Sequence, residues 1–220
     1  MTGKLQNKVD ELVSQIRNGI QTGRYPAGTM FYQEALAEEY KVSRTPVREA
    51  LMKLAYEGYL EIGKKRQFKV PQIDWDQLVQ YYRLREVIDG LGARLLAEEV
   101  VKDEDKTLVF IEELESTLSR MEGVINSWNL QKWSKENVKF HTLIIEATKN
   151  TPLINQLSVV QVSANIFYPA VMANPSRAKI ALDEHRLILN AIRKGEPDLA
   201  ENIARFHIRS ALKDGIDQKD

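Results

Sequence analysis

Apolar residues in the first 60 positions recur at a helical spacing, which predicts three helices. The first stripe extends from Leu5 to Thr22, and the glycines and proline of residues 23–28 end it. A short helix is expected at Gln33–Tyr40. A third begins near Ser43–Pro46, because proline suits the first turn of a helix, and it ends at Gly58. The expected buried positions of this third helix are Val47, Ala50, Leu51 and Leu54.

After Gly58, apolar and polar residues alternate over residues 59–62 and 67–70, which predicts two short strands. Gly-Lys-Lys-Arg at residues 63–66 joins them, so the predicted hairpin has a basic tip. Helix, helix, turn, helix and basic hairpin are the elements of a winged helix-turn-helix. We therefore expect residues 1–71 to form a DNA-binding domain.

Residues 72–220 have the helical period throughout. The candidate helices lie near residues 74–100, 103–126, 129–148, 152–172, 175–194 and 196–213. Short connections between consecutive helices favour an antiparallel bundle. The expected fold class is therefore mainly α, with an N-terminal winged helix-turn-helix, its small β-hairpin wing, and a C-terminal antiparallel six-helix bundle.

Composition narrows the class of protein further. With 220 residues, of which 43% are hydrophobic, the chain can form packed cores. The absence of cysteine excludes disulfides, thiolate zinc fingers and iron–sulfur clusters. Because no apolar run is long enough for a membrane span and residues 1–10 lack an apolar signal core, we expect a cytoplasmic protein without membrane contact.

The formal net charge of zero conceals an asymmetry. Residues 1–71 contain 12 Lys/Arg and 8 Asp/Glu, a charge of +4, whereas residues 72–220 contain 19 and 23, a charge of −4. A basic first domain suits a polyanionic partner. This small difference gains weight because basic residues fall at both places where a winged helix touches DNA.

The start of the third helix is the candidate DNA-reading element. Arg44 and Arg48 are four residues apart and share a face that lies away from the apolar stripe. In the major groove, the arginine fork matches the O6 and N7 acceptors of guanine. Ser43 and Thr45 can donate hydrogen bonds to phosphates. The alternative is that these arginines are solvated surface charges.

The hairpin tip is the second candidate contact. Lys64, Lys65 and Arg66 would lie along the DNA backbone or in the minor groove. They would add salt-dependent affinity more than sequence selectivity.

The same residues carry a family resemblance. The segment EALAEEYKVSRTPVREAL at 34–51, followed by Leu54, Glu57 and Gly58, resembles the signature of GntR-family bacterial transcription regulators. The resemblance extends from about residue 5 to residue 70, and its Ser-Arg-Thr-Pro-Val-Arg-Glu-Ala-Leu core is highly specific. It implies that Arg44, Thr45 and Arg48 contact double-stranded operator DNA. The wing departs from many relatives, because basic residues follow a single tip glycine, which favours electrostatic contact.

All three histidines fall in the C-terminal half. His141, His185 and His207 each lie on the apolar face of a different predicted helix, and Asn137 shares a side with His141. Imidazoles that converge from separate helices commonly bind zinc, nickel or other borderline cations, and the Asn137 oxygen could be a fourth, weak ligand. The alternatives are histidines that only pack in the core or that bind a carboxylate directly, without metal.

The C-terminal half resembles the FCD effector domain of the FadR-type branch of GntR regulators. The matching segments are 82–88, 140–143 with Asn150, 184–189 with Ala191 and Ile192, and His207. Six helices rather than seven indicate the VanR-like subgroup. The resemblance implies a divalent metal on one Asp and three His, and a small carboxylate effector.

In this chain Asn137 stands at the position of that Asp, so the ligand set is neutral. It favours Zn²⁺ or Ni²⁺, and the bound dication keeps its full charge, which suits an anionic hydroxy-acid, keto-acid or sugar-acid effector. Arg85 matches a position that relatives often use near the pocket. Helix phase adds three candidates for the cavity lining, which are Asn165, Tyr168 and Arg177.

These features predict a ligand-responsive transcription regulator rather than an enzyme. A homodimer would bind a palindromic operator, and the effector would change the spacing of the two winged heads. A remote alternative is a metalloenzyme that uses the three-histidine centre, which needs a nearby general base. Glu146 and Glu184 lie on histidine-bearing helices, but both are expected to point away from the histidines.

Overall fold

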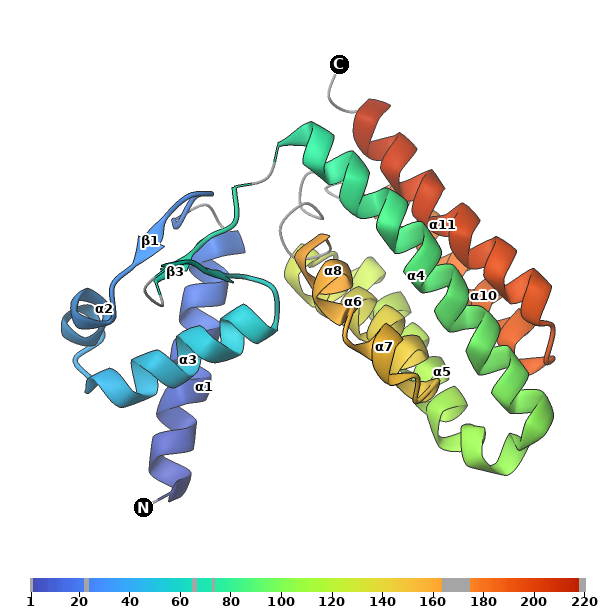
Figure 1. Ribbon diagram of the computed structural model, residues 1–220, viewed down its shortest axis with the longest axis horizontal. Helices are drawn as coiled ribbons and strands as arrows, with labels where there is room; N and C mark the ends of the chain where they lie inside the picture. The colour runs from blue at the N-terminus through green and yellow to red at the C-terminus, as the bar shows by residue number, and fades with distance from the viewer. Residues whose placement is uncertain (1, 22–23, 65–66, 73, 164–174, 218–220) are drawn as a thin grey trace. The chain divides into compact units, whose positions relative to one another are not determined.

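The computed structural model divides into two compact units, Met1–Asp74 and Trp75–Asp220 (Figure 1). The structure describes residues 2–21, 24–64, 67–72, 74–163 and 175–217.

The first unit is a winged helix-turn-helix. Its elements are α1 (Thr2–Gln21), β1 (Met30–Phe31), α2 (Gln33–Glu39), α3 (Arg44–Tyr56), β2 (Glu61–Ile62) and β3 (Phe68–Lys69). The strands form an antiparallel sheet in the order β1-β3-β2, in which Phe68 pairs with both Phe31 and Ile62. The pattern of apolar residues does not predict β1, because a strand of two residues is too short to show alternation.

The core of this unit lies between α1, α3 and the sheet. The four apolar positions expected in α3 are all fully buried, and Ile16 of α1 is buried with them. Gly58 follows the helix with a φ of +75°, a left-handed conformation that glycine adopts without strain, so the predicted helix end is confirmed. An ion pair of 2.9 Å between Lys53 and Asp10 also links α3 to α1.

The second unit is a helical bundle. Its described helices are α4 (Trp75–Lys102), α5 (Glu104–Asn126), α6 (Leu130–Ala147), α7 (Thr151–Ile154), α8 (Leu157–Val162), α10 (Pro175–Arg193) and α11 (Pro197–Asp217). The long helices α4 and α11 pack side by side, and α10 packs against α11, α5 and α4 (Figure 1). The mainly α fold class is confirmed. Among the described residues, no helix is long and apolar enough to cross a membrane.

The single helix predicted over residues 152–172 is wrong in the part that the structure describes, and residues 164–172 lie outside the described residues. Asn155 ends α7 as its C-cap, and α8 starts two residues later. Asparagine has a low helix propensity because its side chain competes for nearby backbone groups. Leu153 of α7 and Leu157 of α8 are both buried against Ile88 and Ile145, so the two short helices together cover one side of α4 and α6.

Candidate metal centre and nucleic-acid interface

The start of α3 presents the predicted DNA contacts to solvent. Ser43 is the N-cap, and Arg44, Thr45 and Arg48 are all exposed, whereas Val47 is fully buried. Arg44 makes an ion pair of 3.0 Å with Glu34 of α2. Both of these side chains are mostly exposed, so the pair contributes little stability and can open when a phosphate or base competes for Arg44.

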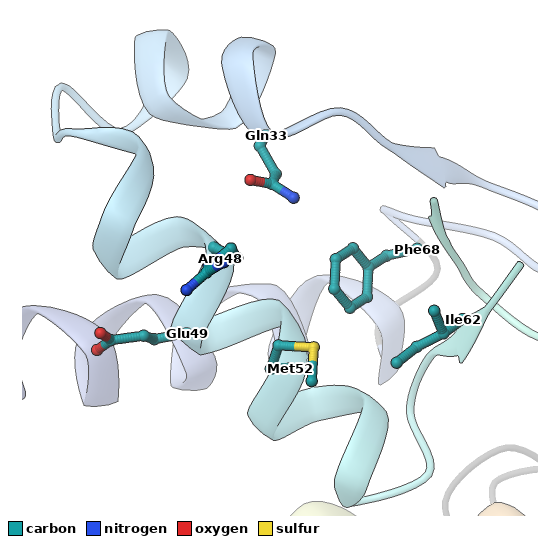
Figure 2. A pocket seen from close by; sticks show the side chains of 6 residues that line it. All are labelled: Gln33, Arg48, Glu49, Met52, Ile62 and Phe68. Atoms are coloured by element: carbon teal, nitrogen blue, oxygen red, sulfur yellow. The ribbon is translucent and has the colours of Figure 1, made fainter. Parts of the chain in front are cut away.

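A groove of about 580 Å³ lies between α3 and the wing, as Figure 2 shows. Its lining residues are Gln33, Arg48, Glu49, Met52, Ile62 and Phe68. About half of the surface of Met52 and of Ile62 is exposed, so the groove is lined by apolar side chains as well as by Arg48. Apolar contact suits a thymine methyl group, and a guanidinium suits guanine. The groove therefore joins the two predicted DNA contacts, the helix and the wing.

The wing tip is described only in part. Lys64 is exposed, whereas Lys65 and Arg66 lie outside the described residues. On β3, Lys69 pairs with Glu61 of β2 at 3.5 Å.

The three histidines meet inside the bundle. His141 of α6, His185 of α10 and His207 of α11 are all buried, at 3% relative exposure or less. Nε2 of His185 lies 3.3 Å from Nε2 of His141 and 3.1 Å from Nε2 of His207. The apolar stripes of three separate helices thus bring three imidazole nitrogens to one point, as the sequence predicts.

These distances fit a metal ion better than a set of hydrogen bonds. Two nitrogens bound to one tetrahedral zinc at about 2.0–2.1 Å lie about 3.3 Å apart. His141 and His207 each direct Nδ1 at a carboxylate, which places the ring proton on Nδ1 and leaves Nε2 as an acceptor. His185 has one proton for two such acceptors. A cation at the centre of the three Nε2 atoms satisfies all of them.

A buried atom on the helix of His141 supports this fit. Asn137 Oδ1 has no hydrogen-bond partner among the described residues. Buried polar atoms without a partner are rare, since each costs about 1–3 kcal/mol. Asn137 lies one turn before His141 on α6 and is 2% exposed. Its orphan oxygen is therefore suited to be the fourth ligand.

Two carboxylates that the sequence pattern does not assign to the site accept hydrogen bonds from the Nδ1 atoms of the histidines. Asp89 Oδ1 accepts a hydrogen bond from His141 Nδ1 at 2.6 Å, and Glu184 Oε2 accepts one from His207 Nδ1 at 2.7 Å. The expectation that Glu184 points away from the histidines is wrong. Helix α10 packs against several helices, so two consecutive positions of it can both be buried. Glu146, in contrast, is exposed.

Burial by itself would raise the pKa of both carboxyl groups. At Asp89 the charge of Arg85, with the hydrogen bonds from His141 and Arg85, outweighs burial and holds the pKa well below its usual range. At Glu184 the hydrogen bond from His207 and the charge of Arg177 lower the pKa in the same way. Both groups are therefore ionised at neutral pH.

The imidazoles are neutral at the same pH. Burial lowers the pKa of His141 to about 4, although Asp89 opposes the shift. Burial also lowers the pKa of His185 and of His207, and the charges of Arg177 and Arg85 add to the effect at both. At His207 the hydrogen bond to Glu184 and the charge of Glu184 oppose the shift. Neutral imidazole is the form that binds metal.

The structure describes two of the four residues that are predicted to contact the effector. Arg85 is buried and pairs with Asp89 at 3.2 Å. Arg177 is buried and pairs with Glu184 at 3.2 Å and with Asp214. Asn165 and Tyr168 lie outside the described residues.

Comparisons with known proteins identify the family of each of the two units. Residues 8–70 match the family described as "Bacterial regulatory proteins, gntR family", and residues 80–210 match the "FCD domain". The chain therefore belongs to the GntR family of bacterial regulators, with an FCD domain as its second unit.

Curated relatives are named as transcriptional regulators, which supports a regulator rather than an enzyme. The "Probable D-xylose utilization operon transcriptional repressor" of Paenarthrobacter nicotinovorans is 26% identical over 91% of this chain and 87% of that protein. The "Galactonate operon transcriptional repressor" of Escherichia coli is 24% identical over 94% of this chain and 96% of that protein. The solved structure of E. coli McbR/YncC has the same fold, with a TM-score of 0.73, 19% identity and coverage of 97% of this chain and 99% of that chain.

Proposed function

We propose that this regulator binds a palindromic operator as a homodimer in the cytoplasm, and that a small carboxylate bound next to a divalent metal in the FCD domain changes its DNA affinity. The convergence of three histidine Nε2 atoms beside the orphan Asn137 oxygen carries the proposal. The assignment to the VanR-like subgroup also belongs to the proposal.

In this proposal His141, His185, His207 and Asn137 hold the metal. All four ligands are neutral, so the set favours Zn²⁺ or Ni²⁺. When bound, the metal supplies a positive charge at which an effector carboxylate can bind. One relative is named for the galactonate operon, and galactonate is a hydroxy-carboxylate of the kind we propose.

The two buried arginines support an anionic effector. Arg85 and Arg177 each pair with one of the carboxylates behind the metal ligands. Both also lie close enough to Tyr82 for their charges to oppose the rise that burial causes in its pKa. Guanidinium groups bind carboxylates through paired hydrogen bonds, so an entering effector would compete with Asp89 and Glu184 for them.

Exposed apolar residues on α4 support the homodimer. Leu84, Val87 and Leu91 are spaced three and four residues apart and are 37–47% exposed, so they form one apolar stripe. Phe206 of the neighbouring α11 is 57% exposed. Apolar stripes of this kind mark protein–protein contacts, and an isologous pairing would cover the same stripe on both copies.

Thermal unfolding of chelator-treated protein tests the metal centre. We expect Zn²⁺ or Ni²⁺ to raise Tm by several degrees more than Mn²⁺ does, because a ligand that binds only the folded state stabilises it by about 2.7 kcal/mol at one hundred times its Kd. His141→Ala should abolish the rise. If no metal shifts Tm, the effector pocket is metal-free and must hold its ligand through arginine and histidine alone.

Gel-shift titration tests the DNA-binding part independently. We expect the protein to bind a fragment of its own upstream region at nanomolar concentration, with an affinity that falls steeply as salt rises. Equal affinity for random DNA of the same length at moderate salt would contradict operator binding.

A further inference from the structure

Two of the three histidines each end a series of buried contacts from an arginine to a carboxylate to the imidazole, which we call a relay. On α4, Arg85 Nε lies 3.2 Å from Asp89 Oδ2, and Asp89 Oδ1 accepts from His141 Nδ1 at 2.6 Å. The side chains of all three residues are 3% exposed. The order is therefore arginine, carboxylate, imidazole, and then the point where the Nε2 atoms meet.

A second relay repeats this order on different helices. Arg177 of α10 lies 3.2 Å from Glu184 Oε2, which also accepts from His207 Nδ1 at 2.7 Å. No third relay exists among the described residues, because Nδ1 of His185 has no hydrogen-bond partner there. Two relays built from separate helices thus end at the same nitrogen cluster.

We infer that Asp89 and Glu184 are positioning residues of the metal centre, and that Arg85 and Arg177 limit its metal affinity by neutralising these carboxylates. The inference rests on the proposed metal site. A carboxylate that accepts the Nδ1 proton fixes the tautomer and orientation of the imidazole and makes Nε2 a stronger ligand. A guanidinium on that carboxylate opposes this effect, and its charge also repels a dication.

The relays also explain how a neutral ligand set can hold a cation. With Asn137 in place of a carboxylate ligand, no negative charge lies directly on the four ligands. Asp89 and Glu184 place two negative charges one hydrogen bond further out. The arginines then determine how much of this charge acts on the metal.

Zn²⁺ affinity, measured by competition with a fluorescent chelator, separates these roles. We expect Asp89→Asn and Glu184→Gln each to weaken Zn²⁺ binding about 10- to 100-fold. Arg85→Met and Arg177→Met should instead tighten it about tenfold, because each frees a buried carboxylate and removes a positive charge. A merely structural role would not give opposite signs along one relay, and the second relay replaces the first if a variant of the first does not fold.

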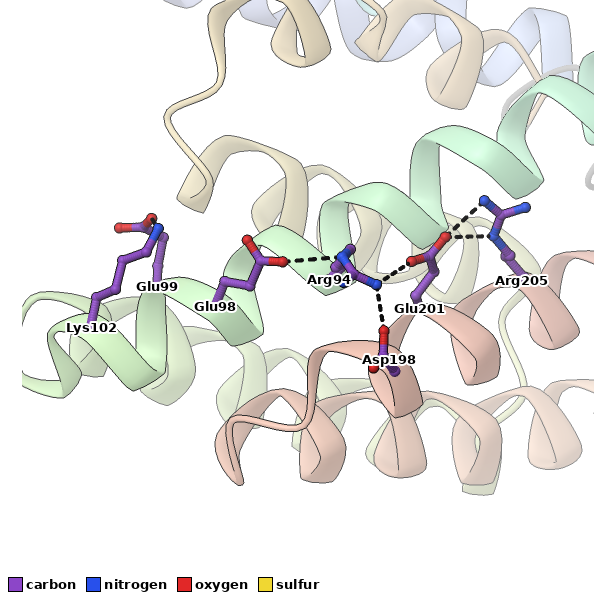
Figure 3. A network of polar contacts seen from close by, with 7 residues as sticks. All are labelled: Arg94, Glu98, Glu99, Lys102, Asp198, Glu201 and Arg205. Carbon is purple, nitrogen blue, oxygen red and sulfur yellow. Dashed lines mark hydrogen bonds and ion pairs between the residues drawn. The ribbon is translucent and has the colours of Figure 1, made fainter.

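The chain offers a matched control on the same helix. Arg94 and Glu98 of α4 form an ion pair of 3.0 Å with the same four-residue spacing as Arg85 and Asp89 (Figure 3). Arg94 also pairs with Asp198 and Glu201 of α11, so it joins helices without touching a histidine. Arg94→Met and Glu98→Gln should leave Zn²⁺ affinity unchanged.

Each outcome has a distinct meaning. If the unmodified protein does not bind Zn²⁺, the metal part of the proposed function fails and this inference fails with it. If it binds Zn²⁺ but Asp89→Asn and Glu184→Gln bind equally well, the inference is overturned and the metal part of the proposed function stands. If the arginine variants weaken binding as the carboxylate variants do, the limiting role of the arginines is overturned.

Discussion

Asn137 is the residue whose identity most directly sets the charge of the metal centre. Its side chain is buried, its oxygen has no hydrogen-bond partner among the described residues, and it lies one helical turn from His141. An amide there gives an oxygen ligand without charge, whereas the resemblance implies a carboxylate at this position in relatives.

Asn137→Asp should therefore strengthen metal binding and weaken the metal-free fold. We expect about tenfold tighter binding of Mn²⁺, with a smaller gain for Zn²⁺, because a charged oxygen suits the harder cation. Without metal, a buried carboxylate lacking a partner should lower the free energy of unfolding by about 3–5 kcal/mol. Chelator competition and urea unfolding measure the two effects, and an unchanged Mn²⁺ affinity would contradict a ligand role for residue 137.

The depressed histidine pKa values make the metal-free protein sensitive to acid. In the unfolded chain a histidine titrates near pH 6.5, whereas burial lowers the pKa of His141 to about 4 and lowers those of His185 and His207 as well. The unfolded state binds more protons between these values, so stability should fall as pH drops from 7 towards 5.

Urea unfolding of chelator-treated protein at pH 7, 6 and 5 measures this slope. Each fully linked histidine contributes about 1.4 kcal/mol per pH unit. His141→Gln should reduce the slope, since it removes one of the three linked groups. Equal stability at all three pH values would contradict the burial of neutral imidazoles.

For single residues, the sequence predicts that the three histidines point into the bundle. It does not predict the carboxylates that accept their hydrogen bonds. Each histidine repeats the helical phase of its apolar neighbours, so its inward direction is readable. Arg85 and Asp89 also share the phase of the buried residues Leu78 and Tyr82, a signal for a buried charged pair. No such signal exists for Glu184, because its burial depends on how α11 packs against α10.

Among the elements, α3 and the wing decide how the protein reads DNA. Arg48 borders the groove with Met52 and Ile62, whereas Lys64 lies near the wing tip and is exposed. The two basic residues should therefore contribute in different ways.

Arg48→Ala should cost about 1–3 kcal/mol of operator binding and reduce discrimination between bases. Lys64→Ala should weaken binding to all sequences about equally and reduce the salt slope by about 1. Gel shifts at several salt concentrations, with operator and random DNA, separate the two effects. A uniform loss for both variants would show that Arg48 contacts only the backbone.

Helices are predictable where their apolar period is long, and short elements are not. Helices α1, α4, α5, α6, α10 and α11 each span several turns, and the sequence places all of them. The strand β1 and the division of residues 151–162 into α7 and α8 involve too few residues for a period. Tertiary packing decides their conformation.

For the whole molecule, variants of the exposed apolar residues test the proposed homodimer. Val87→Glu and Phe206→Glu place a charge on the exposed apolar positions of α4 and α11, and we expect each to shift the protein towards monomer in analytical ultracentrifugation. Val109→Glu of α5 is the control, since Val109 is 70% exposed and lies outside this stripe. Dimers of unchanged stability in all three variants would place the interface elsewhere.

The class of the protein can be predicted from its sequence. The signature in α3 and the apolar helix faces that contain the histidines are local features of the sequence. Effector identity is not predictable, because the shape of the pocket depends on side chains from several helices whose relative rotation the sequence leaves open. The ion pairs of Arg177 with Glu184 and Asp214 illustrate the limit, since they join α10 to itself and to α11.

The convergence of His141, His185 and His207 has a consequence for the lifetime of the protein in the cell. These residues are 44 and 22 positions apart, so a metal on them would close two loops in a chain that has no cysteine and hence no disulfide. Such a cross-link would slow unfolding and proteolysis as long as metal is present. Metal shortage would then shorten the half-life of the regulator itself, so its abundance would report metal supply even at constant synthesis.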